Sequence, residues 1–120
     1  MPNHNYNKGY VLENEIVKAC KKRGFIFAQR TAGSHSVADV IGIIPNGTVI
    51  LFQAKSTEKY LNKGLTDIIK GDNVQKLLEL PDNIIKVLVV KEKSGNKRLT
   101  HCYKYDHINN KWVNINFEIK

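Results

Sequence analysis

Residues 38–55 read ADVIGIIPNGTVILFQAK, and this stretch decides the fold. It holds two runs, 38–44 and 48–55, that are rich in Val and Ile and are separated by Pro45-Asn46-Gly47. β-Branched residues favour strands, and an Asn-Gly pair is a strong signal for a tight turn between two strands. The stretch therefore predicts a β-hairpin.

Three polar side chains interrupt the apolar pattern of this hairpin. Asp39 lies inside an apolar run, where an unpaired carboxylate would be costly to desolvate. Gln53 and Lys55 stand at positions i and i+2, which places them on one face of their strand, and pairing of the hairpin brings them near Asp39. These three residues are candidate functional residues. A buried Asp39–Lys55 ion pair with a purely structural role is the alternative interpretation.

A helix is predicted over residues 10–23, because its apolar residues recur at helical spacing and Gly24 stands at the expected C-cap. Glu13 shares the apolar stripe of this helix with Ile16 and its neighbours, so we expect its carboxylate to point with the buried face. Glu15 is expected to point outward. Glu13 therefore joins the candidate functional residues.

These side chains match the needs of phosphodiester hydrolysis. Two carboxylates and an amide oxygen are ligands that Mg²⁺ prefers, so we expect Glu13, Asp39 and Gln53 to converge on one such ion. Lys55 would orient or deprotonate the attacking water and neutralise charge on a phosphate, while the metal polarises the scissile group. The set indicates a metal-dependent nuclease.

The remaining segments predict a single domain over residues 1–120, with an order α-β-β-β-α-β-β-β and a mixed sheet flanked by helices. We expect strands over 25–31, 84–90, 98–105 and 112–119, with 84–90 at the sheet centre. A short helix is predicted to begin at Asp72 as N-cap, with Gln75 completing a capping box, and to stop before Pro81. Residues 1–8 are expected to form a polar arm and residues 56–71 a flexible basic segment.

Composition narrows the class of protein. The chain has 120 residues, 42% of them hydrophobic, and a formal charge of +8, which favours a polyanionic partner such as nucleic acid. It shows no apolar signal-peptide core and no run near the roughly 18 apolar residues of a membrane span, so we expect a cytoplasmic protein with no membrane contact. Cys20 and Cys102 lack a CxxC spacing and predict reduced, structural thiols.

A family resemblance rests on short motifs in a matching order: Lys8-Gly9 with Glu13, Gly24-Phe25, Arg30, Gly33-Ser34, Asp39-Val40-Ile41 and Gln53-Ala54-Lys55. Together they resemble the archaeal-type Holliday junction resolvases of the PD-(D/E)xK nuclease superfamily, over roughly residues 8 to 80. The resemblance implies a restriction-endonuclease-like α/β fold. It also implies a homodimer that makes paired nicks in a four-way DNA junction with Mg²⁺, for which Mn²⁺ would substitute.

By this resemblance Glu13 and Asp39 would be metal ligands, and Lys55 would be the catalytic lysine. Ser34 and Arg30 would lie in the active site or contact a phosphate of the substrate. Two positions depart from the family pattern. Ala38 replaces the proline that usually precedes the aspartate, which changes backbone stiffness more than chemistry. Gln53 replaces an acidic residue, so it contributes one oxygen but no charge, and we predict weaker metal binding.

Further DNA contacts are less specific. Lys8, Lys59 and Lys63 would follow the DNA backbone, or they are solvated surface residues. His35 would touch a phosphate or shuttle a proton, although an ordinary loop histidine is the preferred interpretation. The aromatic residues near the C-terminus, Tyr103, Tyr105 and Trp112, are expected to pack, within the chain or across a dimer interface, rather than to stack on bases.

Two rival functions remain open at this stage. One is another nuclease on the same fold, with a repair, restriction-like or nicking role. The other is a catalytically weakened nucleic-acid-binding protein, in which Gln53 marks a lost metal site.

Overall fold

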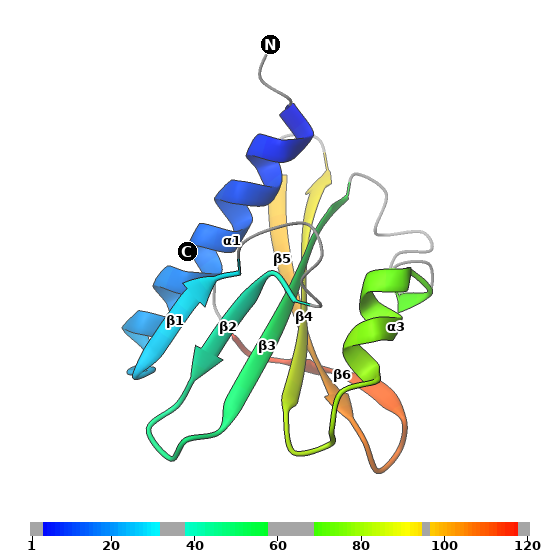
Figure 1. Ribbon diagram of the computed structural model, residues 1–120. Helices are drawn as coiled ribbons and strands as arrows, with labels where there is room; N and C mark the ends of the chain where they lie inside the picture. The colour runs from blue at the N-terminus through cyan, green and yellow to red at the C-terminus, as the bar shows by residue number, and fades with distance from the viewer. Residues whose placement is uncertain (1–3, 32–37, 58–68, 95–96, 118–120) are drawn as a thin grey trace.

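The computed structural model describes residues 4–31, 38–57, 69–94 and 97–117 (Figure 1). Its elements are α1 (His4–Lys22), β1 (Phe27–Arg30), β2 (Val40–Ile43), β3 (Val49–Thr57), α3 (Asp72–Leu78), β4 (Ile85–Ser94), β5 (Lys97–Asp106) and β6 (Lys111–Ile115). Within these ranges no helix combines the length and the apolar composition that crossing a bilayer requires.

The strands form one sheet in the order β1-β2-β3-β4-β5-β6. All neighbours are antiparallel except β3 and β4, which are parallel. A parallel pair needs a crossover between its strands, and the segment that carries α3 provides it. The predicted mixed sheet is confirmed. The aliphatic strand β4 lies between β3 and β5, and residues 87–90 are buried, as its continuous apolar run indicated.

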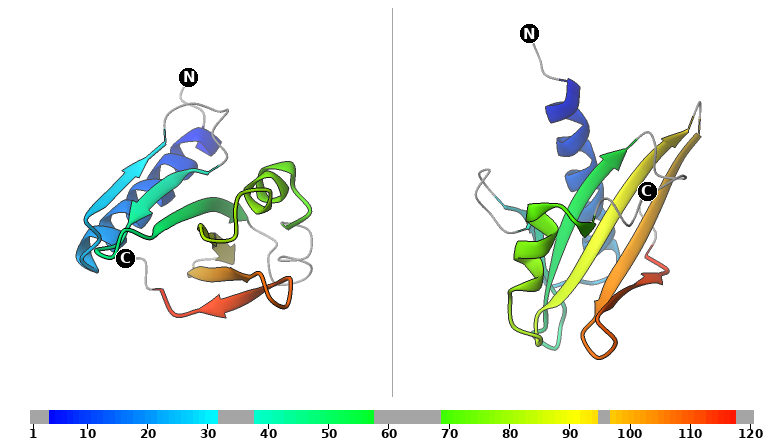
Figure 2. Two further views of the ribbon diagram at one scale, coloured as in Figure 1. Left: turned by 60° about the horizontal axis from the view of Figure 1, so that its bottom comes forward. Right: turned by 90° about the vertical axis from the view of Figure 1, so that its right-hand side faces the viewer.

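The two helices cover opposite faces of the sheet (Figures 1 and 2). On one face, Leu12 and Ile16 of α1 share a buried cluster with Phe52 of β3. On the other face, Leu77 of α3 packs with Leu51. Successive strand residues point to opposite faces, so the odd-numbered residues of β3 face α3 and the even-numbered ones face α1. This alternation decides on which face the candidate residues lie.

The hairpin that the Asn-Gly pair predicted is present. Val40 pairs with Phe52 and Ile43 with Val49. At the turn, the Gly47 amide donates to the Ile44 carbonyl at 2.8 Å, and Gly47 has a φ of 90°, a conformation that glycine adopts without steric cost.

Helix α1 begins earlier than predicted, at His4. Residues 4–8, which we assigned to a polar arm, are therefore helical, because a helix that has nucleated extends through backbone hydrogen bonds without needing an apolar stripe. The other end agrees with the sequence. Gly24 has a φ of 87°, and the Phe25 amide donates to the Cys20 carbonyl at 3.1 Å.

Other predicted boundaries shift as well. The N-cap of α3 is Gly71 rather than Asp72, and no side chain caps the helix. Instead of closing a capping box, the side-chain Nε2 of Gln75 donates to the Ile69 carbonyl at 2.6 Å. Strand β3 runs on to Thr57, so the first residues of the segment expected to be flexible are part of the sheet.

The aromatic residues of the last two strands pack within the chain, as predicted. Tyr105 and Trp112 meet edge to face, with ring centroids 5.2 Å apart. Trp112 packs on the α3 side of the sheet, whereas Ile115 packs on the α1 side. Val113 is 40% exposed, and β6 is an edge strand with a neighbour on one side only.

Candidate active site

Asp39 directly precedes β2 and is held in the sheet by its backbone. Its amide donates to the Phe52 carbonyl at 2.8 Å, which places Asp39 opposite Gln53. The Gln53 Nε2 donates to Asp39 Oδ2 at 2.9 Å, and the Ala54 amide donates to the same oxygen at 2.8 Å. The structure thus brings Asp39 and Gln53 together, on the sheet face that α3 covers. The backbone donor Ala54 carries no side-chain signal from which the sequence could have identified it.

The carboxylate of Asp39 lies in a partly dry setting. Burial raises the pKa of Asp39 above its ordinary value of 3.8. The Ala54 hydrogen bond and the charges of Lys55 and Arg30 act in the opposite direction and favour the ionised form. Gln53, which touches it, is only 3% exposed. Asp39 is therefore a desolvated carboxylate that two cations and two amide donors stabilise.

Lys55 follows Gln53 by two residues on β3 and points to the same face. It is half-buried. It acts on Asp39 through its charge, but the ion pairs of the described side chains do not include a direct Asp39–Lys55 contact. The purely structural ion pair between these two residues is therefore not what holds the site together.

Glu13 has a different partner from the one we expected. Its Oε1 accepts a hydrogen bond from Arg30 Nε at 2.9 Å, and the side chains are 18% and 30% exposed respectively. Arg30 pairs with Val40 in the sheet and also exerts its charge on Asp39. Arg30 therefore links the two carboxylates electrostatically. Among the contacts of the described side chains, Glu13 is linked to Asp39 through Arg30, and its role as a metal ligand stays a prediction.

Glu15 was expected to point outward, and this is wrong. Its carboxylate accepts a hydrogen bond from Lys91 of β4 at 2.8 Å. The pair ties α1 to the sheet centre. Sequence spacing along one helix could not reveal this partner, which lies 76 positions away.

A family model of archaeal Holliday junction resolvases matches residues 4–120. The chain belongs to this family. The match covers nearly the whole chain, including α1, the hairpin and the strands that follow, and it identifies the domain as an α/β restriction-endonuclease-like fold of a Holliday junction resolvase-type nuclease. A search of curated protein sequences finds no match to this chain.

The oxygen atoms of this resolvase-family site suit a hard divalent cation. The Gln53 Nε2 and the Ala54 amide both donate to Asp39 Oδ2, and neither contacts Oδ1. Because Gln53 turns its nitrogen toward Asp39, its Oε1 is the amide atom left for a metal. Among the described residues, no three His, Cys, Asp or Glu side chains gather as a ready metal site. The donor set fits such an ion through Asp39 and Gln53, and Glu13, whose Oε1 accepts from Arg30, has Oε2 as a further oxygen for it.

Several residues that the sequence or the resemblance singled out lie outside the described part of this resolvase-family chain. They are Ser34, His35, Lys59 and Lys63. Lys8 lies in α1, and its side chain is also outside the described part. Their roles stay predictions.

Both cysteines are free and buried, as predicted. Burial raises the pKa of the Cys20 thiol to about 12 and that of Cys102 to about 11. They pack in the same apolar cluster as α1 and serve the core rather than the site.

Proposed function

We propose that this resolvase-family chain is a structure-selective DNA endonuclease that resolves four-way junctions by metal-dependent hydrolysis of phosphodiesters. The observation that carries the proposal is the desolvated Asp39 carboxylate, held by Gln53 and the Ala54 amide at 2.9 and 2.8 Å and facing the charges of Lys55 and Arg30. Such a group is poised to bind a cation next to a phosphate. The net charge of +8 supports a DNA substrate.

Asp39 Oδ1 and Gln53 Oε1 would hold Mg²⁺, for which Mn²⁺ would substitute. When bound, the ion supplies a Lewis acid and lowers the pKa of its water. Lys55 orients the attacking water and neutralises charge on the phosphate as it develops. Gln53 holds Asp39 in place through its amide nitrogen.

Arg30 has two roles in this proposal. In the structure it neutralises Glu13 through a 2.9 Å contact. A guanidinium binds phosphate with two parallel hydrogen bonds, so an arriving DNA strand would compete with Glu13 for Arg30. Transfer of Arg30 to the phosphate would leave both oxygens of the Glu13 carboxylate open to a cation. Substrate binding and completion of the ligand set would then be coupled.

A four-way junction needs two symmetry-related cuts. A two-fold homodimer presents two identical sites in that relation, so we propose a dimer as the active form. Each protomer would then nick one of the two opposing strands.

The second candidate function is a junction-binding protein with weakened catalysis. Gln53 favours it, because an amide replaces a charged ligand. This candidate predicts binding to junctions without product, whereas the nuclease proposal predicts both binding and product.

The deciding experiment compares cleavage of a four-way junction, a flap and a linear duplex by the wild-type protein with Mg²⁺, with Mn²⁺ and with EDTA. Asp39→Ala and Lys55→Ala are the test variants, and Lys104→Ala, at an exposed position of β5, is the matched control. The nuclease proposal expects junction cleavage by the wild type and the control alone, and none in EDTA. Junction binding by every protein, with no product from any of them, would establish the binding protein instead.

A further inference from the structure

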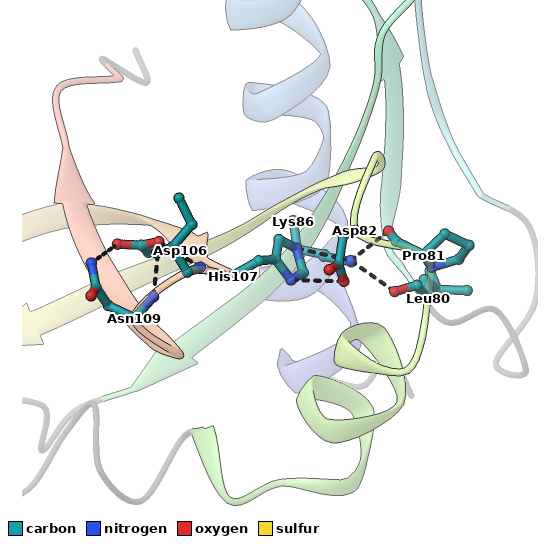
Figure 3. Close-up of polar contacts among 8 residues, drawn as sticks. Leu80, Pro81, Asp82, Lys86, Asp106, His107 and Asn109 are labelled. Atoms are coloured by element: carbon teal, nitrogen blue, oxygen red, sulfur yellow. Dashed lines mark hydrogen bonds and ion pairs between the residues drawn. The ribbon is translucent and has the colours of Figure 1, made fainter.

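A second polar cluster lies near the start of β4, just beyond the end of α3 (Figure 3). Its centre is Lys86, whose side chain is fully buried. The Lys86 Nζ donates to the carbonyls of Leu80 and Pro81 at 2.9 and 2.8 Å and lies 3.1 Å from His107 Nε2. An ammonium has three N–H donors, and here each has an acceptor. The cost of burying this charge is thereby compensated.

The acceptors come from separate parts of the chain. Leu80 and Pro81 follow α3 immediately, so Lys86 binds the carbonyls just beyond its C-terminal end, where a cation is favoured. His107 lies in the turn between β5 and β6. Lys86 therefore joins the end of α3, the first residues of β4 and the last hairpin of the sheet.

With Lys86 charged, the geometry points to one arrangement of the protons on the His107 ring. Lysine is only a donor, so the His107 Nε2 accepts, and the ring proton lies on Nδ1. The Nδ1 faces Asp82 Oδ1 at 3.2 Å, to which it donates (Figure 3). The groups that face the imidazole are thus the Lys86 cation, the Asp82 carboxylate and the ring of Tyr105, which packs edge to face at 5.0 Å. A protonated His107 would lose its acceptor and place two cations 3.1 Å apart.

The end of α3 is connected to the candidate active site. Leu77 is fully buried in one cluster with Leu51 and Ala38. Ala38 precedes Asp39, and Leu51 lies two residues before Gln53 on the same face of β3. A shift of α3 would therefore be transmitted to the residues that carry the carboxylate and the amide.

We propose that Lys86, His107 and Asp82 form a proton-sensitive clasp, which holds the end of α3 on the sheet and thereby positions Asp39. The part of this inference that concerns the positioning of Asp39 rests on the proposed function. The clasp is closed while His107 Nε2 accepts from Lys86, and protonation of that nitrogen removes the acceptor and opens it. Lys86 is a positioning residue, because it acts through α3 and Ala38.

The first test is the tautomer of His107, read from the ¹⁵N resonances of its ring at neutral pH. The clasp requires a protonated Nδ1 and an unprotonated Nε2. A proton on Nε2, alone or together with Nδ1, would overturn the clasp regardless of any enzymatic activity.

The second test uses Lys86→Met, which keeps an unbranched side chain, shortens it by one atom and removes its charge. Lys104→Met, at an exposed position of β5, is the matched control. We expect at least a tenfold faster hydrogen exchange at the amides of Glu79 and Ile84, which donate to carbonyls at the end of α3 and just beyond it. The amide resonance of Ala54, which reports on Asp39 Oδ2, should shift in Lys86→Met alone. Faster exchange with an unmoved Ala54 resonance would refute the positioning of Asp39.

The third test uses His107→Gln, whose amide oxygen still accepts from Lys86 but does not titrate. The exchange at Ile84, corrected for the intrinsic rate, should depend on pH in the wild type and in His101→Gln but not in His107→Gln. Equal pH dependence in all three proteins would overturn the proton sensitivity.

Cleavage provides the last readout. Lys86→Met should lower kcat by about tenfold with little change in KM, because the substrate contacts remain. If the wild type cuts no junction, the proposed function fails, whereas the tautomer, exchange and Ala54 measurements still decide on the clasp.

Discussion

Replacing Gln53 by Glu tests the contact at the centre of the site. In the wild type, the Gln53 amide nitrogen donates to Asp39 Oδ2 at 2.9 Å. A hydrogen bond to a charged group contributes about 1.5–3 kcal/mol, and the substitution removes it. It also places a second carboxylate against the first. Two like charges about 4 Å apart repel by about 4 kcal/mol at an effective dielectric constant near 20.

The full sum of these effects will not be observed, because uptake of one proton by the carboxylate pair limits the repulsion. We expect Gln53→Glu to lower the free energy of unfolding by about 3 kcal/mol in metal-free buffer, within the range these two effects allow. For a domain of this size the loss corresponds to a fall in Tm of about 10 °C. Divalent cations should reverse it, because a cation between two carboxylates turns repulsion into ligation.

The assay is thermal unfolding at pH 7 with EDTA and with increasing Mg²⁺. Gln29→Glu, at an exposed position of β1, makes the same chemical change and should alter the free energy of unfolding by less than about 0.5 kcal/mol. Cleavage by Gln53→Glu should also reach half of its maximal rate at a lower Mg²⁺ concentration than the wild type needs. A Gln53→Glu protein with the Tm and the metal dependence of the wild type would refute the reasoning.

Four further outcomes follow from the structure. Asp39→Asn should abolish cleavage and raise the Tm in metal-free buffer at pH 7. Burial raises the pKa of Asp39, so the folded protein favours the protonated carboxyl. The stability that this preference adds is present below pH 3.8 and is lost as the pH rises through the higher pKa of the folded state. The stability difference between this variant and the wild type should therefore grow from pH 3.5 to pH 7, and a difference that does not grow would contradict the burial argument. Cys20 and Cys102 should not react with a thiol reagent at pH 8 until the protein is unfolded in urea, because their pKa values are raised to about 12 and about 11; their contribution to stability is complete below pH 9.0 and is lost as the pH approaches those values. Arg30→Gln should weaken junction binding and reduce the slope of log affinity against log salt by about 1, and an unchanged slope would exclude a phosphate contact. Glu13→Gln should leave that slope unchanged and alter the free energy of unfolding by less than about 1 kcal/mol, since its ion pair with Arg30 is partly exposed.

The sequence by itself determined the local elements of this protein and one half of its site. The Asn-Gly turn and the β-branched runs that flank it predicted the hairpin, and the hairpin's register then places Gln53 opposite Asp39. The aliphatic run of residues 84–90 likewise identified the central strand. These inferences succeeded because strand period, turn chemistry and hairpin pairing act over a few neighbouring residues.

Only the tertiary structure decided the partners of Glu13 and Lys86. Glu13 shares its helical stripe with core residues. The strand that it contacts depends on how α1 lies across the sheet, and the structure places it against Arg30 at the end of β1. Lys86 belongs to a run that is otherwise aliphatic, and its acceptors come from the end of α3 and from a turn 21 residues away. Helical and strand periods specify a face but not the neighbour that covers it. That choice is made when the β3–β4 crossover and the packing of both helices bring distant segments together.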